Sequence, residues 1–168
     1  MNKAIFLDRD GVINKDYVDY VYTIEKFQLL DGVVEALQKF KTAGYKLVII
    51  TNQSGIAKGI YKKEDVYNVY HHIQELCGGL LDELYYAPHN ENFTSVSLTR
   101  KPGSLMIEKG MAKFDVDPSQ SWMVGDKDRD LVPAKKLGIK TALIDSEGDK
   151  SKYDFVTSSL LEVANHIV

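Results

Sequence analysis

The sequence predicts an α/β fold in which a mostly parallel sheet lies between two layers of helices. Short apolar runs alternate along the chain with helical segments of about ten to fifteen residues. Each apolar run stops at polar or turn-forming residues, as buried parallel strands do. The 168 residues, 44% of them hydrophobic, match the size of one ordinary domain. We therefore expect residues 1–168 to form a single domain with a three-layer, Rossmann-like arrangement.

The expected strands are short and apolar, and acidic, hydroxyl or glycine residues follow several of them. Asp8 stops the first strand and Thr51 follows the second, while Gly125 follows the fourth. The strands are expected at residues 4–7, 46–50, 84–87, 122–124 and 140–144, with a short edge strand at 155–156.

The expected helices have apolar residues at helical spacing and recognisable ends. Asp31 is placed to cap the first helix and Gly44 to end it. Pro133 is compatible with a helix only near its first turn. Ser159 and Glu162 form a capping-box pattern that opens the last helix. Helices are expected at residues 32–43, 66–76, 104–113, 129–137 and from 159 onward, and residues 12–30 and 88–103 are expected to be irregular.

Composition argues against several classes of protein. Cys77 is the single cysteine, so a disulfide framework and a Cys-rich zinc site are excluded. The longest apolar run, Leu47 to Ile50, is far below the roughly 20 residues that span a bilayer. The net charge of −3 argues against bulk binding of nucleic acid. We expect a cytoplasmic monomer or small homo-oligomer that binds neither nucleic acid nor a membrane and shows no signal peptide.

Chemically active residues follow the expected strands, at the sheet edge where ligands bind in open α/β folds. Several carboxylates gathered there cannot all stay ionised without a cation. Their oxygen atoms suit Mg²⁺, which binds alongside phosphate. A hydroxyl and an ammonium facing them would bind a phosphoryl group, so the residues predict a phosphoryl-transfer site. They are Asp8, Asp10, Thr51, Asn52, Arg100, Lys101, Asp126, Lys127 and Asp130.

The chain resembles the haloacid dehalogenase (HAD) superfamily in four motifs that occur in the family's order. All four lie at an expected strand end or in an adjoining loop. The resemblance implies a Rossmann-like HAD fold and hydrolysis of a phosphomonoester through an aspartyl phosphate. The motifs are Phe6-Leu7-Asp8-Arg9-Asp10-Gly11-Val12, Ile49-Ile50-Thr51-Asn52, Lys101, and Val124-Gly125-Asp126 with Asp130.

The resemblance also implies a role for each motif residue. Asp8 would attack phosphorus, and Asp10 would protonate the leaving oxygen and later deprotonate the hydrolytic water. Thr51 would donate a hydrogen bond to the phosphoryl group, whose charge Lys101 would offset. The carboxylates of Asp8 and Asp126 and the backbone carbonyl of Asp10 would hold Mg²⁺. In supporting roles, Asp130 would orient Lys101 or a metal-bound water, and Lys127 lies beside the same motif.

Longer stretches resemble the branch of heptose-bisphosphate phosphatases and histidinol phosphatases, which lack a cap domain. These stretches are Asp8-Arg9-Asp10-Gly11-Val12-Ile13-Asn14, Thr51-Asn52-Gln53-Ser54-Gly55-Ile56-Ala57, Arg100-Lys101-Pro102 and Met123-Val124-Gly125-Asp126-Lys127. The resemblance favours D-glycero-D-manno-heptose 1,7-bisphosphate as the substrate. Histidinol phosphate or another small phosphomonoester is the alternative. Candidate substrate contacts are Asn52, Gln53, Ser54 and Arg100.

One departure from this branch concerns a structural zinc ion. Members often bind it through a Cys-x-His and a later Cys-x-Cys in the loop before Arg-Lys-Pro. In this chain the loop keeps only His89, and Ser97-Leu98-Thr99 stands where the second pair would be. One histidine without thiolates cannot form a closed tetrahedral site. We therefore expect Mg²⁺ and no zinc.

A phosphoacceptor signalling domain of the receiver type is the alternative from a different class. It also places acids, a hydroxyl and a lysine around Mg²⁺ on a parallel sheet, but it stores the aspartyl phosphate. Asp10, two residues after the expected nucleophile, and the late acids Asp126 and Asp130 favour a hydrolase. A catalytically silent binding domain would carry this set of residues only by coincidence.

Overall fold

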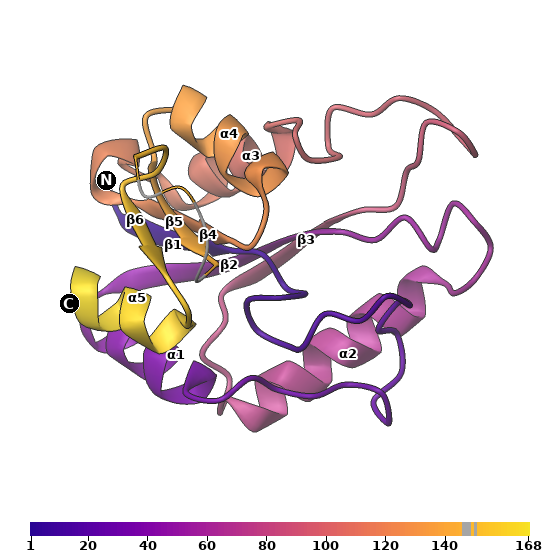
Figure 1. Ribbon diagram of the computed structural model, residues 1–168, viewed down its shortest axis with the longest axis horizontal. Helices are drawn as coiled ribbons and strands as arrows, with labels where there is room; N and C mark the ends of the chain where they lie inside the picture. Colours follow the sequence, from indigo (N-terminus) through magenta and orange to yellow (C-terminus); the bar gives the residue numbers. More distant parts are fainter. Residues whose placement is uncertain (146–148, 150) are drawn as a thin grey trace.

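The computed structural model describes residues 1–145, 149 and 151–168. Its six strands form one sheet in the order β3-β2-β1-β4-β5-β6, and every neighbouring pair is parallel. The predicted α/β class is confirmed (Figure 1). The strands are β1 (Lys3–Leu7), β2 (Tyr45–Asn52), β3 (Glu83–Ala87), β4 (Trp122–Gly125), β5 (Lys140–Ile144) and β6 (Phe155–Thr157). The helices are α1 (Val33–Thr42), α2 (Lys63–Leu76), α3 (Leu105–Phe114), α4 (Asp128–Lys136) and α5 (Leu160–Ile167), with a 3₁₀ turn at Pro118–Gln120.

Helices cover both faces of the sheet, as the predicted three layers require (Figure 1). Successive residues of a strand point to opposite faces. Ile5 and Leu7 of β1 therefore belong to the core beneath α1, α2 and α5. Ala4 and Phe6 belong to the second core, under α3 and α4. Both faces of β1 are therefore buried, which explains why its apolar residues form a continuous run and do not alternate with polar ones.

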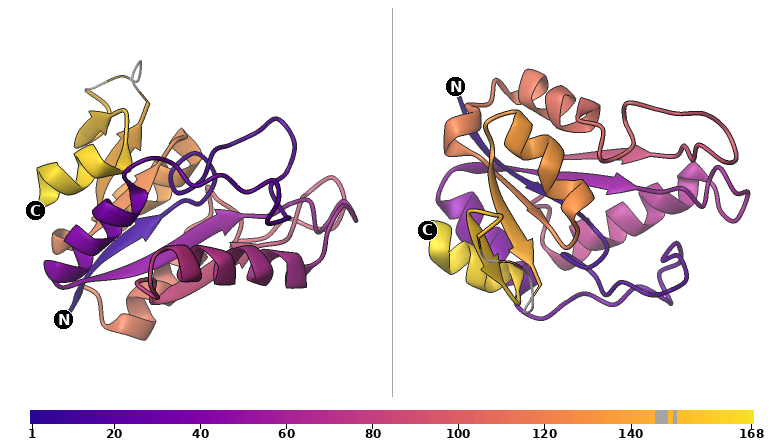
Figure 2. Two further views of the ribbon diagram at one scale, coloured as in Figure 1. Left: turned by 90° about the horizontal axis from the view of Figure 1, so that it is seen from below. Right: turned by 45° about the horizontal axis from the view of Figure 1, so that its top comes forward.

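Three connecting segments extend past the same end of the sheet (Figure 2). They join β1 to α1, β2 to α2, and β3 to α3, and all three leave the carboxyl ends of parallel strands. The first includes residues 12–30, which contain no helix or strand, as expected. We call residues 15–27 the flap. Among the described residues, no helix is long and apolar enough to cross a membrane.

Helix ends differ from the sequence-based expectations in three places. Asp31 does not cap α1, because the chain enters this helix through Gly32 in a left-handed conformation (φ 76°), which puts Asp31 one residue too early. Pro133 lies inside α4, beyond its first turn. Because proline has no N–H, it cannot donate to the carbonyl of Arg129 four residues earlier. Arg129 is exposed, so water can reach it. Ser159 accepts a hydrogen bond from the Glu162 amide, 3.3 Å away. The Glu162 carboxylate accepts instead from the preceding residue, Ser158, so only half of the capping box forms.

Candidate active site

Three carboxylates meet beyond the carboxyl ends of β1 and β4. Asp8 directly follows β1, Asp126 follows β4, and Asp130 lies in the first turn of α4. One oxygen atom of each lies within 4.8 Å of the others. Asp8 and Asp130 are buried, and Asp126 is half-buried. Three negative charges this close together require cations nearby.

Lys101 supplies one of these cations. Its Nζ atom lies 2.7 Å from Oδ1 of Asp8 and 2.8 Å from Oδ1 of Asp130. It also donates to the carbonyl of Ile50, 2.8 Å away. Burial by itself would lower the pKa of Lys101, but the two carboxylates raise this pKa above its ordinary value. The lysine therefore stays charged inside the protein.

Asn52 fixes the backbone of that lysine. The Asn52 side chain accepts a hydrogen bond from the Lys101 amide at 3.0 Å and donates to the Lys101 carbonyl at 3.1 Å. The last residue of β2 thus holds the loop before α3 in register with the sheet. Both ends of the Asn52 amide already have partners within the protein. The expected contact of Asn52 with the substrate stays a prediction.

The acid cluster still lacks positive charge after Lys101 is counted. Burial raises the pKa of Asp8 to about 7, although Lys101 opposes this shift. Burial also raises the pKa of Asp126, against the opposing charge of Lys127. Oδ1 of Asp126 is buried and has no hydrogen-bond partner among the described residues. A divalent cation bound by oxygen atoms fits this place, and the carboxylates of Asp8 and Asp126 are positioned to hold Mg²⁺.

Gly11 brings the turn after β1 against this cluster. Its φ angle is +86°, and a Cβ atom added to it would lie only 2.5 Å from Oδ2 of Asp126. A side chain at position 11 would therefore displace the Asp126 carboxylate. The glycine allows the chain to double back beside β4 and brings Asp10 to the mouth of the site.

The carboxylate of Asp10 is held by three side chains. Arg9 donates to both of its oxygens, at 3.0 and 3.2 Å, and Asn14 donates to Oδ1 at 2.9 Å. The amide of Gln53 donates to Oδ2 at 3.3 Å. Arg9 also donates to the carbonyl of Val21 in the flap, 2.7 Å away. Sequence reasoning missed Arg9, although its position between two acids was the available signal.

Thr51 and Gln53 lie together at the end of β2. Both side chains are buried, and Nε2 of Gln53 donates to Oγ1 of Thr51 at 2.9 Å. The Gln53 amide thus touches both Asp10 and Thr51. In the structure the Gln53 amide is bonded to these neighbouring side chains. The expected contact of Gln53 with the substrate stays a prediction.

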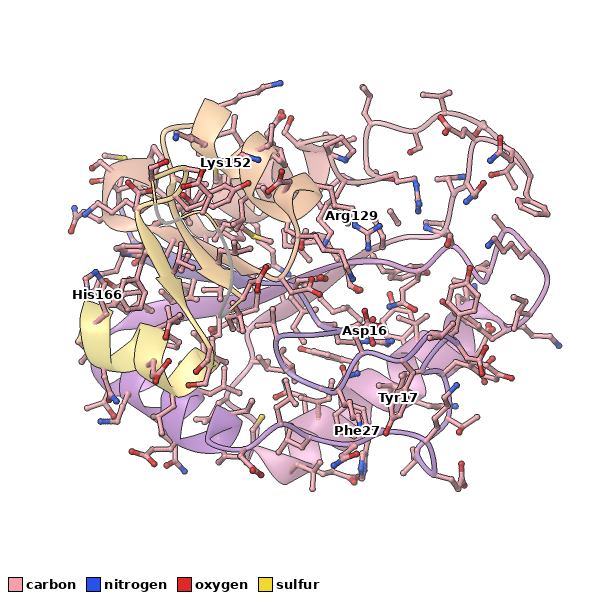
Figure 3. The ribbon with its side chains drawn as sticks, viewed as in Figure 1. Asp16, Tyr17, Phe27, Arg129, Lys152 and His166 are labelled. Carbon is pink, nitrogen blue, oxygen red and sulfur yellow. The ribbon has the colours of Figure 1, made fainter. Side chains whose placement is uncertain are left out.

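A polar cavity of about 250 Å³ opens above these groups. The flap borders it on one side and the start of α4 on the other, as Asp16, Tyr17 and Arg129 show in Figure 3. Lys127 joins the two sides, because its Nζ atom lies 2.9 Å from Asp16 and 3.1 Å from Asp126. The cavity is lined by every residue predicted to act on the substrate: Asp8, Asp10, Thr51, Asn52, Gln53, Ser54, Arg100 and Lys101.

Ser54 and Arg100, which line the cavity, come from the loops after β2 and after β3. The hydroxyl of Ser54 lies 3.4 Å from the hydroxyl of Tyr20 in the flap. Arg100 donates to the backbone carbonyl of His89 at 3.3 Å, which ties together the two ends of the loop before α3. Both residues are half-buried, so part of each side chain is accessible from the cavity.

Comparison with known proteins agrees with this geometry. Residues 7–144 match the family described as haloacid dehalogenase-like hydrolase. The chain belongs to this family. The matched residues include the acid cluster, Thr51 and Lys101, and the membership confirms both the predicted superfamily and the prediction of a hydrolase.

Relatives of the HAD chain cover nearly its whole length. A Haemophilus ducreyi protein named D-glycero-beta-D-manno-heptose-1,7-bisphosphate 7-phosphatase is 37% identical, over 98% of either chain. A Burkholderia mallei protein named as the alpha-anomer 7-phosphatase is 34% identical, over 99% of this chain and 92% of the relative. The crystal structure of a D,D-heptose 1,7-bisphosphate phosphatase from B. bronchiseptica, complexed with magnesium and phosphate, has a TM-score of 0.89 at 27% identity and covers 98% of this chain and 97% of its own. The predicted phosphatase class is confirmed.

Proposed function

We propose that this HAD phosphatase removes the 7-phosphate of D-glycero-D-manno-heptose 1,7-bisphosphate through an aspartyl phosphate on Asp8. The observation that carries the chemistry is the buried ion pair of Asp8 with Lys101, beside the unpartnered oxygen of Asp126. The substrate is supported by relatives of this name that align with nearly the whole chain. The 250 Å³ cavity has room for a phosphoryl group and part of a sugar.

In the first step, an oxygen of Asp8 attacks phosphorus and the bond from phosphorus to the sugar oxygen breaks. Asp10 gives its proton to that leaving oxygen, so the sugar leaves as a neutral alcohol. Lys101 and the hydroxyl of Thr51 bind the oxygens of the transferred group. Asp8, Asp126 and the backbone carbonyl of Asp10 would hold Mg²⁺, which would offset the negative charge of the phosphoryl group and the acids.

In the second step, Asp10 removes a proton from water and the resulting hydroxide attacks the aspartyl phosphate. The bond between phosphorus and the Asp8 oxygen breaks, which restores the carboxylate and releases inorganic phosphate. Asp10 ends with the proton that it lost in the first step. Arg9 and Asn14 hold its carboxylate in place throughout.

The phosphate that stays on the sugar needs a second cationic contact. Arg100 lines the cavity and remains half-buried, and we assign it this contact, with Ser54 as a neighbouring hydrogen-bond donor. The relatives include proteins named for either anomer of the sugar.

We propose Mg²⁺ as the resident metal ion and no structural zinc. Among the described residues, the acid cluster is the group of metal-ligating side chains close enough to share an ion, and His89 is not in such a group. The proposal also includes one domain over residues 1–168 and action in the cytoplasm, where phosphorylated sugars are held, as a monomer or small homo-oligomer.

The test is phosphate release from three substrates, with and without Mg²⁺: the heptose 1,7-bisphosphate, histidinol phosphate and p-nitrophenyl phosphate. We expect kcat/KM for the heptose bisphosphate to exceed that for histidinol phosphate by at least about tenfold. A preference for histidinol phosphate would reassign the substrate within the same chemistry. Stable phosphoprotein without release of phosphate would instead favour the receiver-type alternative.

A further inference from the structure

Tyr61 lies outside the four sequence motifs, yet its hydroxyl reaches the catalytic residues through one side chain. The hydroxyl donates to Oε1 of Gln53 at 2.6 Å, and both residues are at least 95% buried. We propose that Tyr61 is a positioning residue, which holds the Gln53 amide in the one orientation that prepares Asp10 and Thr51 for catalysis. This inference rests on the proposed function, because it assigns those two residues their roles in phosphate transfer.

The orientation of the amide follows from its partners. Asp10 is a carboxylate, which can only accept hydrogen bonds, so the NH₂ end of Gln53 must face it. This leaves the carbonyl end for the Tyr61 hydroxyl. The reversed amide would place its oxygen against the carboxylate and its NH₂ group against the phenol. The hydroxyl of Tyr61 therefore gives the carbonyl end of Gln53 a partner in the orientation that Asp10 requires.

The same amide determines which way the Thr51 hydroxyl can donate. Gln53 donates to Oγ1 of Thr51 at 2.9 Å, so the oxygen of this hydroxyl acts as an acceptor toward the amide. Its own hydrogen must then point elsewhere, and a phosphoryl group bound in the cavity would accept it. Thr51 is thereby set to donate to a phosphoryl oxygen before the substrate arrives.

The amide of Gln53 also helps to hold the Asp10 carboxylate. Each of its oxygens accepts two hydrogen bonds, and the bond from Gln53 to Oδ2 is the longest of the four, at 3.3 Å. The amide of Gln53 is thus one of the four donors that fix the orientation of the Asp10 carboxylate at the mouth of the site.

The position of Tyr61 is fixed from several sides. Its ring fills the space left by Gly55, where an added Cβ atom would lie 2.0 Å from the ring. It stacks on Tyr22 of the flap with 4.9 Å between ring centres, and Tyr20 lies edge-on at 5.7 Å. Burial raises the pKa of Tyr61 well above its ordinary value, so the phenol keeps its proton and remains a donor at every working pH.

Removal of one oxygen atom tests the proposal. Tyr61→Phe keeps the ring, its stacking on Tyr22 and its fit against Gly55, but leaves the carbonyl end of Gln53 without its partner, so only the two contacts of the NH₂ end hold the amide. We expect kcat for the heptose bisphosphate to fall roughly tenfold, the effect of losing about one hydrogen bond in the transition state. KM should stay within about twofold, since the walls of the cavity are unchanged. Tyr67→Phe, which removes the hydroxyl of an exposed tyrosine on α2, is the matched control and should keep the wild-type kcat.

A double-mutant cycle separates positioning from a general loss of structure. Gln53→Met keeps the length of the side chain but removes the amide, so it should lower kcat at least as much as Tyr61→Phe. In the Gln53→Met background, Tyr61→Phe should then change kcat by less than about twofold. If Tyr61→Phe alone did not fold, Gln53→Glu would test the other end of the amide: it keeps the acceptor for Tyr61 but loses both donors and should lower kcat, and an unchanged kcat would overturn the proposal.

The outcomes distinguish this inference from the proposed function. A wild-type protein that releases no phosphate from any of the three substrates would overturn the proposed function. An active wild-type protein with full kcat in Tyr61→Phe would overturn the role of Tyr61 alone. Equal effects of Tyr61→Phe in both backgrounds would also overturn it, because the hydroxyl would then act independently of the amide.

Discussion

The ammonium of Lys101 lies 2.7 Å from the Asp8 carboxylate in a place that excludes almost all solvent, with 1% and 7% of the two side chains exposed. An ion pair this deeply buried costs desolvation energy, which the mutual attraction of its members must offset. Lys101 also contacts Asp130, so one cation serves two carboxylates. The remaining negative charge makes the site receptive to a metal ion.

Asp8→Asn is expected to remove the reaction but not the fold. The two side chains are nearly equal in size, but the amide nitrogen and the carbonyl of asparagine are poor nucleophiles. We expect kcat to fall at least about 10³-fold, while the protein stays folded at the assay temperature. Phosphate release and a thermal melt measure the two quantities. Turnover close to wild type would refute Asp8 as the nucleophile.

Lys101→Met is expected to destabilise the protein as well as inactivate it. The substitution leaves Asp8 and Asp130 buried without their ammonium partner. Breaking such a pair costs about 3–5 kcal/mol in the free energy of unfolding, which urea titration of the metal-free protein at pH 7.5 would measure. Lys113→Met breaks an exposed pair with Glu83 and serves as the control, with little expected change. Similar effects of the two substitutions would contradict the buried pair.

The affinity for Mg²⁺ is expected to fall as the pH falls through 7. Burial raises the pKa of Asp8 to about 7, so below this pH Mg²⁺ must displace a proton in order to bind. The apparent Kd should rise by up to about tenfold for each pH unit below 7. Calorimetric titration between pH 5.5 and pH 8.5 measures it, with Asp117→Asn, far from the site, as a control. A Kd independent of pH would be incompatible with this assignment.

The same carboxyl links stability to pH in the metal-free protein. The pKa of Asp8 is about 7 in the folded state and near its ordinary value of 3.8 in the unfolded chain, so the folded state binds the proton more tightly. This contribution to stability is complete below pH 3.8 and is lost as the pH rises through 7. Urea unfolding across this range should show a steeper loss of stability with rising pH in wild type than in Asp8→Asn, since Asp126, whose pKa is also raised, titrates in both; equal slopes would argue against the assignment.

Lys127 is expected to keep the flap in place. Its Nζ atom joins Asp16 of the flap to Asp126, and both Lys127→Met and Asp16→Asn remove the link to the flap. Each should speed hydrogen exchange of the backbone amides in residues 15–20, and the double variant should do no more than either. Lys135→Met, on the far part of α4, should leave this exchange unchanged. Additive effects in the double variant would show that the two residues act separately.

The purified protein is expected to need no zinc. The loop before α3 contributes His89 without thiolates, so metal analysis should find well under one zinc atom per chain. Treatment with a chelator followed by Mg²⁺ should restore full activity. One zinc atom per chain that survives chelation, or activity that returns only after zinc is added, would refute the expectation.

The sheet and the acid cluster could be predicted because local pattern determines both. Apolar runs such as residues 4–7 and 46–50 can be buried only as strands, and parallel strands place their carboxyl ends at one edge. Asp8 and Asp126 therefore lie at the same edge, and the pairing of β1 with β4 brings them together. Lys101 was predictable only through its motif, since its position depends on the hydrogen bonds of its backbone to Asn52.

The contacts made by irregular segments could not be predicted. Arg9 donates a hydrogen bond to Val21, and Tyr61 donates one to Gln53. These residues lie in or beside loops, where no regular spacing of apolar residues predicts the backbone conformation. The helix entry at Asp31 was misjudged for a related reason, because the left-handed Gly32 shifts the cap by one residue. In each case the local backbone conformation, which composition does not reveal, decides which side chains meet.

The contact between Gly11 and Asp126 restricts how this protein can evolve. Any side chain at position 11 would collide with the carboxylate of Asp126, the proposed metal ligand, so the turn geometry and the proposed metal site cannot drift independently. A lineage that lost this glycine would be expected to lose its cation while its sheet stayed folded. Descendants of that kind would survive as well-folded proteins without catalysis, and the identity of this one residue would tell them apart from working enzymes.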